Sequence, residues 1–246
     1  MDARYIKDTE DLIDFIRRSP SPFHVIDNAK RILMENGFSE LKEDEMFRLE
    51  PDRLYFVTRN SSALIAFRTM PAFRCYHIVS AHTDSPCFRI KANPEIMTEN
   101  SCTRLNVESY GGMLLSSWFD RPLSIAGRAF IKTGNGIAER LVDFGDDMVS
   151  IVNLAIHQNR DANNGYKYSV QKEFLPIWSD SGCKDSFIDR IGMHIGCDPE
   201  SILDYDLFLY NRMEPVLWGV DKAVFSSPKI DDLQCAYSAI RGILNA

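Results

Sequence analysis

The sequence lacks any apolar run that approaches the roughly 20 residues a helix needs to cross a bilayer. It also lacks a cluster of basic residues: Lys and Arg are scattered and the formal charge is −7, so nothing favours binding to nucleic acid or to an anionic membrane surface. The amino terminus is polar and charged, which argues against a secretory signal. With 246 residues, 45% of them hydrophobic and 26% charged, the composition is typical of a globular protein with one large or two modest domains.

No C-x-x-C pair occurs among the six cysteines, which stand at positions 75, 87, 102, 183, 197 and 235. Dispersed cysteines favour reduced thiols in a cytoplasmic protein over a disulfide framework or a cysteine-based zinc site. The motifs G-x-G-x-x-G, the P-loop and G-x-S-x-G are also missing. Nucleotide binding and serine hydrolase chemistry therefore have no support from motifs.

The strongest local signal lies between Tyr76 and Pro86. The apolar, β-branched run from Tyr76 to Ala81 predicts a buried strand, and the following His82-Thr83-Asp84 predicts that the strand ends in a loop. Open α/β sheets bind their ligands at such strand ends. An imidazole there can bind a metal, and a nearby carboxylate can fix its tautomer. A loop histidine beside a solvated aspartate is the alternative at this stage.

Helices are predicted near both ends of the chain. Thr9 is the expected N-cap of a helix that ends at Arg18, and Ser21 with Pro22 begins a second helix that ends at Gly37. Helical spacing of apolar residues predicts two more, from 184 to 195 and from 233 to 244. His24 lies in the first turn of the second helix, either as a partly exposed residue or at the edge of a pocket.

Strand signals divide the chain into three parts. Two early strands separated by a turn, 54–57 and 63–67, predict a hairpin within a mixed sheet. A β-rich stretch follows, with strand-like pieces at 88–91, 105–107, 113–115, 126–131 and 207–210. Within it, the apolar segment from 148 to 156 is expected to be a buried helix or strand that leads into His157. The predicted domains are residues 1–93, an inserted β-rich domain over 94–222, and a return to the first domain over 223–246.

Asp231 and Asp232 stand at the beginning of the last predicted helix. The helix dipole favours anions at that end, so simple capping of the helix explains the pair without any ligand. A metal-ligand role is the second interpretation.

Six segments, in this order along the chain, resemble the aspartyl aminopeptidase family of zinc metallopeptidases. They are residues 21–24, 81–86, 118–123, 155–158, 206–210 and 227–233, with sequences SPFH, AHTDSP, WFDRPL, AIHQ, DLFLY and SPKIDDL. The resemblance implies a zinc-peptidase-like α/β domain, with a mixed sheet and helices, interrupted by a β-rich dimerisation domain. It also implies a homo-oligomer built from dimers that removes an amino-terminal, preferably acidic, residue from a peptide substrate.

The resemblance also implies roles for individual residues. His82 matches a metal ligand, Asp84 matches the carboxylate that orients this histidine, and Asp231 matches the aspartate that bridges two zinc ions; other divalent metals are left open. His157 matches a histidine that either binds metal or reaches the active site of a neighbouring subunit to contact substrate. The second role for His157 is the favoured one.

The family pattern continues beyond the last helix with a Glu-Glu pair, whose first member is the general base, and with further metal ligands. No such pair follows Asp231 in this sequence. The catalytic domain is therefore expected to be incomplete at its carboxyl end, inactive alone and associated with a partner. The alternative function is a non-catalytic assembly or regulatory subunit that keeps the oligomerisation domain. A plain α/β binding protein with structural His and Asp residues is the third.

Overall fold

The structure is a computed structural model that describes residues 3–72, 75–98, 102–180 and 185–246. Its residues form two compact units, and the chain leaves the first unit and later returns to it. Unit 1 contains residues 1–85 and 214–246, and unit 2 contains residues 86–213. The domain boundaries expected from the sequence, at 93/94 and 222/223, stay predictions beside this division. No helix in the described ranges is long and apolar enough to cross a membrane.

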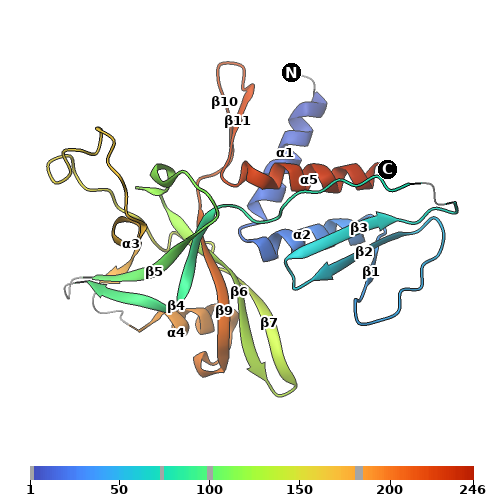
Figure 1. The fold of residues 1–246 in the computed structure, drawn as a ribbon, viewed down its shortest axis with the longest axis horizontal. Helices are drawn as coiled ribbons and strands as arrows, with labels where there is room; N and C mark the ends of the chain where they lie inside the picture. The colour runs from blue at the N-terminus through green and yellow to red at the C-terminus, as the bar shows by residue number, and fades with distance from the viewer. Residues whose placement is uncertain (1–2, 73–74, 99–101, 181–184) are drawn as a thin grey trace. The chain divides into compact units, whose positions relative to one another are not determined.

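Unit 1 combines three helices with a three-stranded sheet and a two-stranded hairpin (Figure 1). Its elements are α1 (Ala3–Arg17), α2 (Pro22–Glu35), β1 (Ser39–Leu41), β2 (Leu54–Arg59), β3 (Ala63–Arg68), β10 (Val216–Trp218), β11 (Val224–Ser226) and α5 (Ile230–Leu244). Strand β2 pairs with β1 in parallel and with β3 in antiparallel orientation, so the predicted hairpin and mixed sheet are confirmed.

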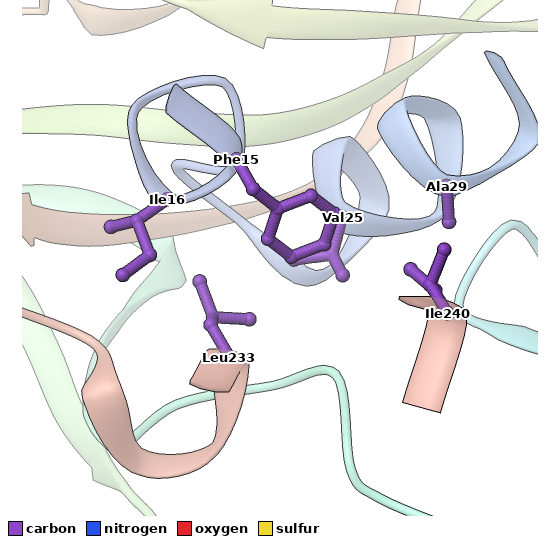
Figure 2. Close-up of a cluster of buried hydrophobic side chains, with 6 residues drawn as sticks. All are labelled: Phe15, Ile16, Val25, Ala29, Leu233 and Ile240. Atoms are coloured by element: carbon purple, nitrogen blue, oxygen red, sulfur yellow. The ribbon is translucent and has the colours of Figure 1, made fainter. Parts of the chain in front are cut away.

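The three helices of unit 1 share one apolar core. Leu33 of α2 and Phe56 of β2 belong to an adjoining buried cluster, which joins the helices to the sheet. Burial of a large apolar side chain contributes about 1.5–3 kcal/mol relative to leaving it exposed. Figure 2 shows the main cluster, whose side chains point toward one another: Phe15 and Ile16 of α1, Val25 and Ala29 of α2, and Leu233 and Ile240 of α5. This packing fixes the beginning of α5 against the end of α1.

The helix boundaries follow the sequence signals in part. Ser21 is the N-cap of α2 in extended conformation with Pro22 in the first turn, and the chain turns through Gly37 at a φ of 84° just after the helix. Helix α1 begins at Ala3, so the prediction that Thr9 caps it was wrong. The Thr9 hydroxyl instead donates a hydrogen bond to the Tyr5 carbonyl at 2.7 Å, as mid-helix threonines do.

The prediction of a buried strand from Tyr76 to Ala81 was also wrong. These residues have no regular secondary structure, and Tyr76, Ile78 and Val79 are 80%, 81% and 75% exposed. A strand is stabilised by the strands beside it, and no strand in the described part of the chain pairs with this segment. The apolar pattern indicates a tendency to be buried, but without a neighbouring strand to pair with, the segment does not form a strand.

Unit 2 is built on a six-stranded antiparallel sheet in the order β7-β6-β9-β4-β5-β8 (Figure 1). Strands β6 and β9 lie so close together at Gly127 that a Cβ there would be 1.9 Å from the Asp206 carbonyl oxygen. Only glycine therefore fits at this position. The strands are β4 (Cys87–Thr98), β5 (Cys102–Tyr110), β6 (Leu123–Thr133), β7 (Gly136–Asp143), β8 (Ile177–Asp180) and β9 (Ile202–Asn211). The short helices are η1 (Leu115–Trp118), α3 (Val170–Glu173), α4 (Phe187–Ile195) and η3 (Pro199–Ser201).

Four of the five strand-like pieces predicted between 88 and 210 lie inside these strands, and the fifth, 113–115, does not. Leu114 is exposed, Leu115 begins η1, and none of the described strands pairs with residues 113–115. Helix α4 ends at Gly196 in the left-handed conformation, as expected, while Lys184, the expected start, lies outside the described residues. The segment from 148 to 156 is buried only at Val149 and Ile151, and residues 152–158 are exposed.

Candidate metal centre

The candidate centre lies in unit 1, where the loop after residue 75 meets the beginning of α5. The loop carries His82 and Asp84, and hydrogen bonds join it to other parts of unit 1. The Thr83 hydroxyl donates to the Ser62 carbonyl at 3.1 Å, and the His82 backbone N–H donates to Asp232 Oδ2 at 3.1 Å. The second bond joins residues 150 positions apart in the sequence.

Asp84 fixes the orientation of the His82 ring. The His82 Nδ1 atom lies 3.0 Å from Asp84 Oδ1 and 3.1 Å from the Asp84 carbonyl oxygen. Both partners are acceptors, so this geometry favours a proton on Nδ1 and leaves the lone pair of the neutral ring on Nε2. A carboxylate that orients a histidine in this way is the usual support of a metal-binding imidazole.

The Nε2 atom of His82 faces the two aspartates at the start of α5. It lies 3.3 Å from Asp231 Oδ1 and 3.7 Å from Asp232 Oδ2. Among the residues that the structure describes, these three form one group whose potential ligand atoms all lie within 4.8 Å of one another. Asp231 and Asp232 depart from helical φ and ψ, and a cis peptide bond joins them.

The charges of the group act on one another. Desolvation lowers the pKa of His82, but the Asp84 carbonyl, the charge of Asp232 and the Asp84 carboxylate together raise it above its ordinary value. A hydrogen bond with the Cys235 thiol lowers the pKa of Asp232; desolvation opposes this, and the His82 N–H and ring lower it further. The same contact with Asp232 raises the pKa of the Cys235 thiol. In this centre, the carboxylates of Asp84, Asp231 and Asp232 therefore surround one imidazole, that of His82.

The donor set fits a zinc ion. Zinc takes imidazole nitrogen and carboxylate oxygen, with about four donors in a tetrahedral arrangement. His82 Nε2 and the aspartate oxygens supply donors of both kinds, and the exposed fractions of the His82 and Asp231 side chains, 55% and 76%, leave the group open to solvent.

The sequence-predicted residues are brought together only in part. His82, Asp84 and Asp231 meet in unit 1, while His157 belongs to unit 2, where it is exposed in a turn. The roles assigned to these four residues stay predictions. From the sequence, Asp232 was expected to cap the helix or, as the second interpretation, to bind a metal, and Cys235 had no assigned part in the site, although its position three residues after Asp232 on a helix places the two side chains on one face.

The order of these residues and the fold around them match a known family. Residues 15–246 match the model of the peptidase family described as "Aminopeptidase I zinc metalloprotease (M18)". The chain belongs to the M18 family. The resemblance to aminopeptidases noted from the six sequence segments is thereby confirmed.

Relatives and solved structures agree with this assignment. The chain is 44% identical over 244 residues to a "Probable M18 family aminopeptidase 2" of Clostridium acetobutylicum, with 96% of this chain and 56% of the relative covered. The structure of Chaetomium thermophilum mApe1 superposes with a TM-score of 0.87 at 27% identity, covering 97% of this chain and 58% of that one. An M18 aminopeptidase of Thermotoga maritima superposes with a TM-score of 0.83 over 100% of this chain and 56% of its own, and its 23% identity shows the fold alone.

The chain thus has the mixed α/β fold of M18 aminopeptidases and spans a little over half the length of these relatives. Five of its six cysteines fall within the described ranges, and none of these five forms a disulfide there.

Proposed function

We propose that this chain forms part of a zinc-dependent aminopeptidase and carries part of its metal centre. The observation that supports the proposal most directly is the group of His82, Asp231 and Asp232, with the Nε2 atom of His82 facing carboxylate oxygens. Family membership supports the zinc and the peptidase chemistry.

Each residue has a defined task in this proposal. His82, through Nε2, and Asp231 would hold the metal, while Asp84 keeps the proton on Nδ1. Bound zinc supplies Lewis-acid polarisation of a peptide carbonyl and acidifies water. The exposed face of Asp231 gives a substrate access to the site, and the second zinc ion that the family resemblance implies would also be bound by Asp231.

His157 is proposed to act on substrate from a neighbouring subunit, since it lies in an exposed turn of unit 2. The homo-oligomer built from dimers, the preference for acidic amino-terminal residues and the cytoplasmic location come from the family resemblance and the dispersed cysteines. They are part of the proposal on that basis. The domain division at 93/94 and 222/223 also belongs to it.

The chain alone is expected to bind zinc and to hydrolyse no peptide. In this proposal Asp231 is used to bind the metal and Asp232 accepts the His82 backbone N–H, so the group of His82, Asp231 and Asp232 offers no further carboxylate to act as a general base. A non-catalytic assembly subunit, the alternative function, requires neither zinc binding nor an intact His82.

The experiment is a calorimetric titration of the metal-free chain with zinc, alongside an assay on peptides that begin with Asp, Glu or Leu. We expect saturable zinc binding that His82→Ala abolishes, and no peptide hydrolysis until a chain carrying the remainder of the relatives' length is added. Absence of zinc binding in the folded chain would remove the metal centre and favour the assembly subunit. Turnover by the chain alone would contradict the expected inactivity.

A further inference from the structure

Asp231 and Asp232 are adjacent and chemically identical, yet their surroundings differ. The Asp231 side chain is 76% exposed and its Oδ1 atom lies nearest to His82 Nε2, at 3.3 Å. The Asp232 side chain is 17% exposed, and its Oδ2 atom lies farther from Nε2, at 3.7 Å. One carboxylate therefore faces solvent and an incoming ion, and the other is turned into the protein.

The less exposed carboxylate, that of Asp232, already accepts a hydrogen bond. Its Oδ2 atom accepts the His82 backbone N–H at 3.1 Å. A hydrogen bond from N–H to a charged carboxylate is stronger than one between neutral groups. A metal that bound Asp232 through Oδ2 would have to share that oxygen with the His82 N–H, whereas Asp231 Oδ1 has only the His82 ring before it among the described hydrogen bonds and ion pairs.

The loop that carries His82 needs such an anchor. Residues 75–85 form neither helix nor strand, so no ladder of backbone hydrogen bonds holds them in place. The bond from the His82 N–H to Asp232 instead joins the loop directly to the first turn of α5, which the burial of Leu233 fixes against the helical core. Two different carboxylates thus hold His82: Asp84 contacts the ring and Asp232 accepts the backbone N–H.

We infer that Asp232 is a positioning residue and not a metal ligand: its carboxylate holds the backbone of His82 so that Nε2 faces Asp231. This inference rests on the proposed function, because it assumes that the metal is bound by His82 and Asp231. It separates the two aspartates by role, with Asp231 binding the ion and Asp232 setting the place of the histidine.

The first arm of the test needs no metal. Hydrogen exchange of the His82 amide is measured by NMR in the metal-free chain for wild type, Asp232→Ala and Asp232→Asn, with Asp27→Ala on the exposed face of α2 as control. Loss of one hydrogen bond of about 1.4 kcal/mol corresponds to about tenfold faster exchange. We expect that acceleration for Asp232→Ala, and a rate within about threefold of wild type for Asp232→Asn, which keeps an oxygen acceptor, and for Asp27→Ala.

The second arm uses cobalt(II) as a spectroscopic stand-in for zinc in the same variants and in Asp231→Asn. Loss of a residue that supports a ligand weakens metal affinity by about 10- to 100-fold without changing the ligand set. We expect Asp232→Ala to weaken cobalt binding within this range with an unchanged visible absorption band, and Asp232→Asn to recover most of the affinity. Asp231→Asn is expected to change the band itself.

Two results would overturn the inference. One is a band change in Asp232→Asn like that in Asp231→Asn, which would make Asp232 a ligand. The other is unchanged exchange of the His82 amide in Asp232→Ala. If the folded wild-type chain takes up no cobalt, the proposed metal centre fails, and the exchange arm by itself decides whether Asp232 holds the loop. Thermal unfolding of each variant confirms that the folded chain is being measured.

Discussion

Asp84 acts on His82 through one short contact, and its loss should be mild. In Asp84→Ala the ring loses the carboxylate at 3.0 Å but keeps the carbonyl oxygen of residue 84 at 3.1 Å as an acceptor for Nδ1. We expect zinc affinity to fall about tenfold, at the low end of the range for groups that support a ligand. Calorimetric titration measures it, with Asp27→Ala as the matched aspartate control.

A loss as large as that of His82→Ala would contradict this account, since Asp84 would then behave as a ligand. A loss below about twofold would show that the carbonyl oxygen alone sets the tautomer.

At this scale the sequence predicted the types of residue but not their division of labour. The chemistry of the side chains suggested a metal site at His82-Thr83-Asp84 and either helix capping or metal binding at 231 and 232, and only the family resemblance singled out Asp231. Nothing in two consecutive aspartates says which one is 76% exposed and which is 17% exposed. That difference comes from the non-helical backbone at both residues and from a hydrogen bond across 150 positions, which no local pattern contains.

Lys229 fastens the start of α5 to the end of α1. Its φ is 61°, and its Nζ atom donates hydrogen bonds to the carbonyls of Ile16 and Ser19 at 3.2 and 2.9 Å. The first of these carbonyls lies in the last turn of α1, where the helix dipole favours a cation. In Lys229→Met both acceptors lose a charged donor, and we expect the free energy of unfolding to fall by about 1.5–3 kcal/mol.

Urea unfolding measures this change, with Lys222→Met, an exposed lysine in the same unit, as control. Lys222→Met should leave the free energy of unfolding nearly unchanged, because the Lys222 side chain is exposed, so the two variants should differ clearly in stability. Equal stabilities for Lys229→Met and Lys222→Met would show that water replaces the ammonium group at no cost.

Tyr205 of β9 gives unit 2 a dependence on alkaline pH. Its hydroxyl donates to the Lys91 carbonyl of β4 at 2.7 Å, and desolvation, together with the charge of Asp204, raises the pKa of the phenol to about 12. The unfolded chain loses this proton near pH 10. The contribution of Tyr205 is therefore fully present below about pH 10 and is lost as the pH rises toward about 12.

In Tyr205→Phe the hydrogen bond is missing, and we expect about 1 kcal/mol less stability near neutral pH. Because the phenylalanine cannot ionise, the deficit relative to wild type should shrink between about pH 10 and 12. Urea unfolding of both proteins across that range checks it. A difference that stays constant with pH would mean that the Tyr205 pKa is not raised in the folded state.

Elements were predictable where local chemistry and a partner agreed. Ser21 and Pro22 begin α2, Gly196 ends α4, and the turn after residue 59 joins two strands that pair along their length. The segment from Tyr76 to Ala81 has the composition of a strand and no strand beside it among the described residues. The composition of a segment indicates whether it tends to be buried, but whether the segment joins a sheet depends on the elements beside it.

Several large apolar side chains of the protein are exposed to water, and we expect the chain to associate in solution. In unit 1, Tyr76, Ile78 and Val79 are exposed as a continuous run, and Ile65 of β3 and Trp218 of β10 are exposed as well. Contiguous exposed apolar surface marks a site of association or aggregation, whereas a single exposed apolar residue does not. Light scattering of the wild-type chain should therefore give a mass well above 28.1 kDa.

The variant Ile78→Lys with Val79→Thr tests whether the run itself causes this association. This variant places a charge and a hydroxyl where the two aliphatic side chains are exposed, so the apparent mass should fall toward that of one chain. The control is Met193→Lys on α4, which changes one exposed apolar residue of unit 2 and should leave the apparent mass unchanged. A wild-type chain that scatters as a clean monomer would contradict the prediction. An undiminished mass in the double variant would move the contact away from residues 75–80, and a lowered mass in Met193→Lys would place it on unit 2.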